Sequence, residues 1–215
     1  MKLTLCEPWL IADLGGPMRV LSFAPHRPGF VTAERILWRE VRNSDLTPDL
    51  DAEGWLAHQV TALDGPPAVA MMTSRAVARF RQASAGSVSC TATVGLGNAE
   101  RVGHRRALHD HDLPAYGTIN IALRLDAGLT DRAMIEALTI AAEARTAAII
   151  QIGMAISTGT ATGTGTDCIA LAARPGTADY AGLHTELGEW IGRATHDSVL
   201  AAARDWMREQ AAQNP

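Results

Sequence analysis

The stretch that decides the fold class is Thr118-Ile119-Asn120-Ile121-Ala122-Leu123-Arg124-Leu125, a run of β-branched and apolar residues that predicts a buried strand. A long amphipathic helix follows, which we expect to begin at an N-cap Thr130 and to end near Ile149. A second apolar run at residues 167–172 predicts another strand. Strands separated by helices in this way predict an α/β (α+β) protein.

Working outward from this stretch, similar patterns predict the remaining elements. Strands are expected at residues 19–24, 31–41, 68–72 and 87–96, and helices at 51–61, 74–82 and 185–208. The early strands follow one another, whereas the later ones are separated by helices. We therefore expect a single domain over residues 1–215, in which a mixed, partly antiparallel sheet packs against helices and residues 208–215 form a frayed tail.

Composition excludes several classes of partner. A net charge of −4 and a pI near 6.0 predict no attraction to nucleic acid or to anionic membranes. No apolar run is long enough to span a bilayer, and the first residues lack the apolar core of a signal peptide, so we expect a soluble, cytoplasmic protein. Three widely spaced cysteines suggest neither a disulfide framework nor a zinc cluster. Composition leaves a homo-oligomer open.

Lysine is almost absent. Lys2 is the only lysine of the chain, so nearly all positive charge is arginine, which does not deprotonate to act as a nucleophile or base. Schiff-base chemistry and a phosphate-binding P-loop lysine are therefore excluded from the interior of the fold.

The most unusual segment is the glycine- and threonine-rich run at residues 157–167, directly before a predicted strand. Glycine allows a backbone to approach a ligand closely, and threonine hydroxyls supply hydrogen bonds. We predict that it binds substrate through Thr162, Gly163, Thr164, Gly165 and Thr166; a surface loop of small residues is the alternative.

A second segment of similar composition, residues 91–98, ends a predicted strand. Thr93 and Gly95 are candidate substrate-binding residues. The Asn98 side chain could donate to an amide carbonyl or a developing oxyanion, although an asparagine after glycine is also typical of a turn.

Other candidates are single residues. His184 precedes a predicted helix and could act as a general acid, or be structural. Cys168 lies in an apolar strand, where a cysteine behaves as a small hydrophobic residue rather than a nucleophile. For His109 and His111 we favour a solvated loop over a metal site, and we expect no metal and no cofactor.

Taken in order, these segments resemble the adenosylcobinamide amidohydrolase (CbiZ) family. The resembling pieces are residues 90–99, 117–121, 142–148, 160–167 and 180–188, which span most of the chain from residue 68 to residue 203. Two departures are visible: Arg145 stands where the family usually has lysine, and residues 26–29 replace a glycine pair.

The resemblance implies hydrolysis of the amide that joins aminopropanol to the corrin ring of adenosylcobinamide, giving adenosylcobyric acid in vitamin B12 salvage. The corrinoid would be substrate rather than cofactor. Its corrin is a large amphipathic disc bearing amide side chains, which suits a cleft of hydroxyls and glycine backbone. Asn120, in the resembling 117–121 piece, is a further candidate for substrate binding.

Our mechanistic hypothesis is that Asp167 or Glu143 activates water, His184 protonates the leaving amine, and Asn98 with backbone N–H groups near Gly163 and Gly165 stabilises the oxyanion. A threonine nucleophile, Thr164 or Thr166, is an alternative. The rival function is a non-catalytic corrinoid carrier or sensor, which a cleft without acid or base would favour.

Overall fold

The computed structural model describes residues 1–42, 45, 50–104 and 117–213. Its main strands are β1 Lys2–Cys6, β2 Trp9–Ser22, β3 Gly29–Glu40, β4 Ala68–Thr73, β5 Arg81–Ala85, β6 Val88–Val94, β8 Ile119–Leu129 and β12 Cys168–Pro175. Short strands are β7 Ala99–Glu100, β9 Ala155–Ile156, β10 Gly159–Thr160 and β11 Gly163–Thr164. The helices are α1 Ala52–Leu63, α2 Asp131–Ile152 and α3 Glu186–Gln213, with a 3₁₀ turn, η2, at Val77–Arg79.

The main sheet is mixed, as predicted. It has eight strands in the order β4-β3-β2-β12-β8-β6-β5, with β1 added beside β2. The β3–β4 and β8–β12 pairs are parallel, and the remaining pairs of this sheet are antiparallel. All six strands expected from the sequence are present.

This sheet folds over on itself. The register of β2 against β3 shifts between Asp13 and Met18, where Gly15 and Gly16 have φ values of 81° and 135°. Such values suit glycine, and a bulge of this kind bends a long strand. As a result β4 lies near β8, although three strands separate them in sheet order, and the Asn120 side chain donates to the backbone oxygen of Met72 at 2.5 Å.

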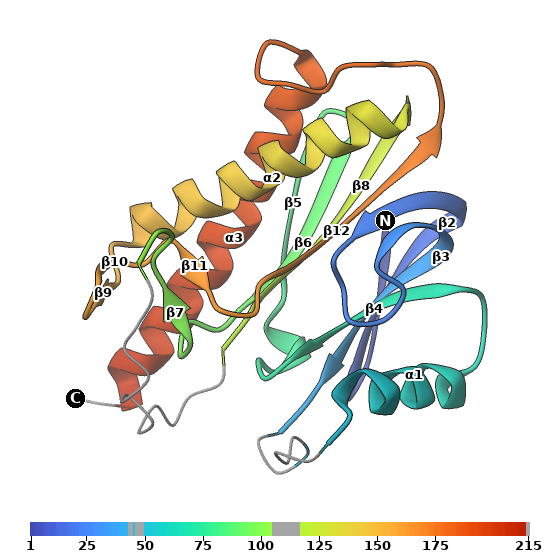
Figure 1. The fold of residues 1–215 in the computed structure, drawn as a ribbon. Coiled ribbons are helices and arrows are strands. Elements are labelled where there is room, and N and C mark those ends of the chain that lie inside the picture. The colour runs from blue at the N-terminus through green and yellow to red at the C-terminus, as the bar shows by residue number, and fades with distance from the viewer. Residues whose placement is uncertain (43–44, 46–49, 105–116, 214–215) are drawn as a thin grey trace.

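Side-chain alternation on β8 shows the resulting layers. Ile121 packs into a core beneath α2 and α3, whereas its neighbour Ala122 faces a second core that includes Trp38 and Met71 of the other half of the sheet. A third, smaller core with Leu56 packs α1 against the outer side of β3 and β4. The molecule is thus layered as helix pair, half-sheet, half-sheet and helix (Figure 1).

Threonine side chains cap the starts of α2 and α3. The Thr130 hydroxyl accepts from the backbone N–H of Ala133 at 3.3 Å, which confirms the predicted N-cap of α2. Thr185 does the same for the N–H of Gly188 at 2.9 Å, at the start of α3. A side chain at Gly188 would collide with the backbone oxygen of Gly182, so glycine at this position lets the start of α3 pack closely against the preceding turn.

Two predicted elements were wrong. Residues 74–82 are not a helix but contain the 3₁₀ turn followed by β5, because the N–H of Val77 is taken by the Glu40 carboxylate at 2.8 Å and residues 81–85 pair with β6. Residues 208–213 are not a frayed tail but the last turns of α3, where Glu209 pairs with Arg75.

Candidate functional site

A cavity of about 300 Å³ opens where the two halves of the sheet meet. The elements that line it lie far apart in the sequence: the ends of β3 and β4, the turn after β6, and the starts of β8 and β12. Its lining residues are Pro25, Val41, Met72, Thr73, Ser74, Asn98, Gly117, Thr118, Asn120, Thr166 and Cys168.

The two glycine- and threonine-rich segments lie side by side at this cavity. β11 pairs antiparallel with β7, so that Thr164 opposes Ala99. Beyond this pair, the N–H of Gly165 donates to the backbone oxygen of Asn98 at 3.1 Å. The structure therefore brings together residues 91–98 and 157–167, which we had singled out separately by their composition.

Gly117 allows a third segment to join them. A Cβ at this position would lie 2.6 Å from the backbone oxygen of Gly95 and 2.6 Å from the nitrogen of Gly97, closer than real Cβ atoms approach. The N–H of Gly95 also donates to the backbone oxygen of Thr118 at 3.0 Å. Gly95 is thus buried in the turn that shapes the cavity wall.

Asn120 is part of the wall, and its side chain is fully buried. Its amide nitrogen donates to Met72 O, as described above, and its Oδ1 accepts from the Thr118 hydroxyl at 2.9 Å. Thr93 is its cross-strand partner and is also fully buried. These two predicted substrate-binding residues therefore support the site from within the protein.

Asp167 anchors the threonine loop. Its Oδ1 accepts from the N–H of Ile119 at 3.2 Å and from the hydroxyl of Thr164, and the N–H of Thr164 lies 3.1 Å from both carboxylate oxygens. Its Oδ2 forms an ion pair with Arg145 of α2. The side chain is only 9% exposed, so these contacts occupy most of its surface.

Arg145 fills the space beneath the loop. Burial lowers the pKa of its guanidinium, which nevertheless stays charged because the ordinary arginine pKa is so high. A Cβ at Gly163 would lie 2.5 Å from Nη1 of Arg145, so the absence of a side chain there lets the arginine reach Asp167. Gly163 thus leaves the space that this ion pair needs.

Glu143 and His184 are not brought to this site. Glu143 is exposed on α2, two residues from Arg145 and therefore on a different side of the helix. His184 is exposed in the turn before α3, which lies beyond the opposite end of β12 from Asp167 (Figure 1). The Ala181 N–H in that turn donates to Glu136, nine residues before Arg145 and thus about 14 Å away along α2.

The remaining candidates have distinct surroundings. Thr166 lines the cavity and donates to the backbone oxygen of Gly117 at 3.1 Å. The hydroxyl of Thr162 instead accepts from the N–H of Val102 at 2.8 Å, and neither residue lines the cavity. Asn98 lines the cavity, and within the described part of the chain its side chain has no hydrogen-bond partner.

Sequence reasoning missed the side of the cavity that β3 and β4 provide. Thr73, the last residue of β4, and Ser74, which begins the segment predicted to be helical, both line it. The Thr73 hydroxyl accepts from the N–H of Arg75 at 3.0 Å, which fixes this turn. Only the abrupt change from an apolar strand to hydroxyl residues could have marked it.

Chemically, the described lining offers hydroxyl, amide, thiol and apolar groups, and no carboxylate or imidazole. Burial raises the pKa of the Cys168 thiol to about 12, so that it stays protonated at neutral pH, in agreement with the expected role as a small hydrophobic residue. No cluster of three or more metal-ligating side chains occurs among the described residues, and His109 and His111 lie outside them.

Comparisons with known proteins place these observations in context. The model of a family described as adenosylcobinamide amidohydrolase (CbiZ) matches residues 2–211. An uncharacterized protein of Methanocaldococcus jannaschii is 38% identical over 94 residues, which cover 40% of this chain and 35% of that protein. A beta-aminopeptidase of Burkholderia sp. is 11% identical, with a TM-score of 0.42 over 90% of this chain and 78% of its own.

None of the described helices is both long and apolar enough to span a bilayer.

Proposed function

The chain belongs to the adenosylcobinamide amidohydrolase family, whose members are hydrolases of carbon–nitrogen amide bonds, and on this premise we propose that it cleaves the aminopropanol amide of adenosylcobinamide. Water adds across the C–N bond, so the products are adenosylcobyric acid and free aminopropanol. The observation that carries the proposal is the family match, which spans nearly the whole chain. In a cell the reaction would serve corrinoid salvage in the cytoplasm.

The size of the cavity supports the way in which such a substrate would bind. A volume of about 300 Å³ is at the lower end of the range of about 300 to 1,000 Å³ for small-molecule pockets. That is enough for the amide-linked aminopropanol side chain of the substrate, but not for the corrin ring. We therefore place the side chain in the cavity and the ring outside, over its rim.

Asn98 is the proposed oxyanion donor. Its side chain lines the cavity and has no hydrogen-bond partner among the described residues, so it can donate to a substrate carbonyl, which becomes an oxyanion when water adds. Two of the backbone N–H groups expected to assist are engaged elsewhere, because Gly165 donates to Asn98 O and Thr164 donates to Asp167. The carboxamide of Asn98 therefore carries this role.

Asp167, with Thr164, is the proposed proton acceptor. Neither Asp167 nor Thr164 lines the cavity, but Asp167 lies between Thr166 and Cys168, which do, and a hydrogen bond joins its carboxylate to the Thr164 hydroxyl. A threonine nucleophile requires a hydroxyl paired with a base such as a carboxylate. The same pair is required if the hydroxyl instead relays a proton from water to the carboxylate. The ion pair with Arg145 opposes this role, because it stabilises the charged carboxylate.

A second function is favoured by one observation. The described lining of the cavity contains no free acid or base, which is what a corrinoid carrier or sensor without catalytic activity would show. Such a protein would use the same cavity and the same rim. It would bind the corrinoid and leave the amide intact.

One experiment separates the two functions. Purified protein is incubated with adenosylcobinamide without added metal, and the mixture is analysed by mass spectrometry for adenosylcobyric acid and aminopropanol. Binding is followed in parallel by tryptophan fluorescence. Product formation supports the hydrolase, and loss of product in Asn98→Ala supports the oxyanion role. Tight binding without product supports the carrier or sensor. If the protein shows no binding and forms no product, both functions are contradicted.

A further inference from the structure

A second pocket, which we call the charged pocket, lies next to the cavity at the end of β3. Its volume is about 360 Å³, and it is lined by Glu7, Pro8, Arg39, Glu40, Arg42 and Asp45. Glu40 belongs to this pocket and the next residue, Val41, to the cavity. The two hollows therefore share one strand end.

Hydrogen bonds fix that shared end. The N–H of Val41 donates to the backbone oxygen of Thr73 at 2.8 Å, and one oxygen of Glu40 accepts from Val77 at 2.8 Å. The N–H of Glu40 donates to the backbone oxygen of Pro8 at 2.8 Å. These bonds hold the walls of the two hollows in a fixed position relative to each other.

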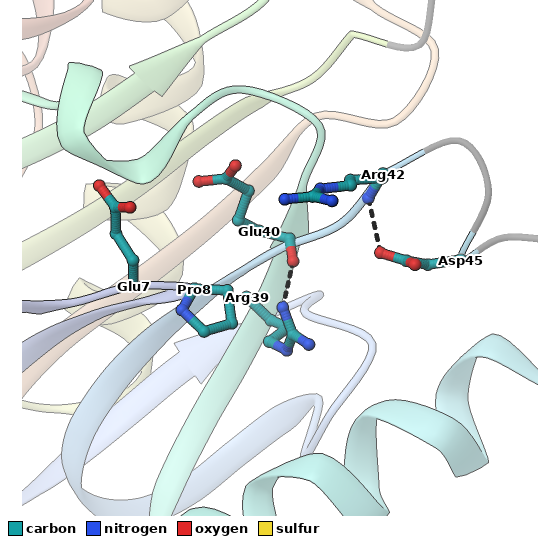
Figure 2. Close-up of a pocket in the computed structure, with 6 residues that line it drawn as sticks. All are labelled: Glu7, Pro8, Arg39, Glu40, Arg42 and Asp45. Carbon is teal, nitrogen blue, oxygen red and sulfur yellow. Dashed lines mark hydrogen bonds between the residues drawn. The ribbon is translucent and has the colours of Figure 1, made fainter.

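Among the described residues, no ion pair joins the charged side chains that line this pocket. Figure 2 shows the charged ends of Glu7, Glu40 and Arg42 gathered on one side of Pro8, whereas Arg39 points to the other side. In the described part of the chain, neither the Glu7 carboxylate nor the Arg42 guanidinium has a hydrogen-bond or ion-pair partner. Glu40 already accepts from Val77, but the Glu7 carboxylate and the Arg42 guanidinium face the opening without satisfying each other.

Such an opening suits a group that both donates and accepts. A primary carboxamide donates through its NH₂ to a carboxylate and accepts through its oxygen from a guanidinium, and hydrogen bonds to charged groups are the stronger ones. A purely anionic group would be repelled by Glu7 and Glu40, which outnumber the single guanidinium on this side. The pocket therefore selects neutral amides rather than phosphates or carboxylates.

We propose that the charged pocket is a second subsite, which binds a side-chain carboxamide on the edge of the corrin ring while the scissile amide lies in the cavity. This inference rests on the proposed function, since it takes the ligand to be a corrinoid. The subsite holds a part of the molecule that does not react. Its contacts are thus the same in substrate and transition state, and they lower KM without changing kcat.

The test uses the full-length variants Glu7→Gln and Arg42→Gln, with Glu189→Gln and Arg193→Gln as matched controls, because these two residues are exposed on α3. We expect each subsite variant to raise KM for adenosylcobinamide, and Kd for adenosylcobyric acid, by about tenfold with kcat unchanged. The control variants should leave both constants unchanged.

A modified probe examines the chemistry directly. A corrinoid whose side-chain carboxamides are replaced by methyl esters has no N–H to donate to Glu7, so it should bind the wild type more weakly, and Glu7→Gln should weaken it no further. If both subsite variants match the controls, the subsite is overturned. If the wild type binds corrinoids but forms no product, the hydrolase proposal fails, while the Kd values still decide on the subsite.

Discussion

Arg145 of α2 forms an ion pair with Asp167 beneath the threonine loop, and this pair joins the helix layer to the edge of the cavity. Neither side chain is more than 19% exposed, so the charges depend on each other rather than on water. The arginine reaches the carboxylate past Gly163, and the carboxylate binds Thr164 and Ile119. One ion pair thus fixes the conformation of a loop that composition alone would leave free.

Removing one partner of this pair should destabilise the protein. We expect Asp167→Asn to lower the free energy of unfolding by about 3 kcal/mol, because Arg145 would be left charged and largely buried. Arg145→Lys, which keeps the charge and introduces the residue usual in the family, should cost much less. Urea denaturation measures both values.

The same variant tests the proton acceptor. If Asp167→Asn is folded at low temperature and retains full turnover, Asp167 is not the base. If its stability is unchanged but turnover is lost, the carboxylate acts in the reaction and contributes little to holding the loop. Thr164→Val and Thr164→Ser complete the set, since only the serine variant retains a hydroxyl for Asp167.

Asn98→Ala should separate catalysis from stability. Loss of an oxyanion donor typically lowers kcat by about 100- to 1,000-fold. Because the Asn98 side chain has no hydrogen-bond partner within the described residues, the unfolding free energy should stay within about 0.5 kcal/mol of the wild type. Asn98→Asp, of similar size but without N–H donors, should show the same loss of kcat. An undiminished kcat in both variants would remove Asn98 from the mechanism.

The sequence predicted the strands and helices of this fold better than the folding of the sheet onto itself. Periodic patterns identified β8, α2 and β12, because an element buried on one or both faces has apolar residues at regular positions in its own sequence. The folding of the sheet onto itself depends on the bend in β2 and on the contact of Asn120 with Met72, 48 residues apart. The first two residues of β5 were predicted to be helical, and the strand was missed, because its pairing with β6, and not its own pattern, determines its conformation.

For the site, composition identified the threonine and glycine segments but not their neighbours. Thr73 and Ser74 are ordinary residues at a strand end, and they line the cavity only because β4 folds toward β8. His184 and Glu143 were selected by residue type. Residue type does not say at which end of β12 His184 lies, or on which side of α2 Glu143 lies. Tertiary position, not chemistry, separates them from Asp167.

Thiol reactivity gives an inexpensive check of the cavity. Cys6 is exposed, whereas burial raises the pKa of both Cys90 and Cys168 to about 12. Treatment of the folded protein with iodoacetamide at pH 8 should therefore give a single adduct, at Cys6, as measured by intact mass and peptide mapping. Cys168→Ala should retain turnover. Rapid alkylation of Cys168 accompanied by loss of activity would instead indicate a reactive thiol in the cavity.

Acid should weaken the contact between α3 and the turn at the cavity. Arg75, which follows the lining residues Thr73 and Ser74, donates two hydrogen bonds to Glu209 at 2.6 and 2.9 Å. The hydrogen bonds from Arg75 hold the pKa of Glu209 below its ordinary value of 4.5. Between these two pKa values the unfolded chain binds more protons than the folded one. The stabilisation is therefore complete above about pH 4.5 and is lost as the pH falls through the folded-state value.

Glu209→Gln removes this dependence. At pH 7 we expect the variant to be about 1 kcal/mol less stable than the wild type, a modest value because solvent screens the carboxylate, which is 28% exposed. The difference should shrink as the pH falls below the folded-state pKa of Glu209, where the wild-type carboxyl is also neutral. Urea denaturation of both proteins between pH 3 and pH 7 measures it. A difference that stays constant across this range would mean that Glu209 stabilises α3 by packing and not through its charge on Arg75.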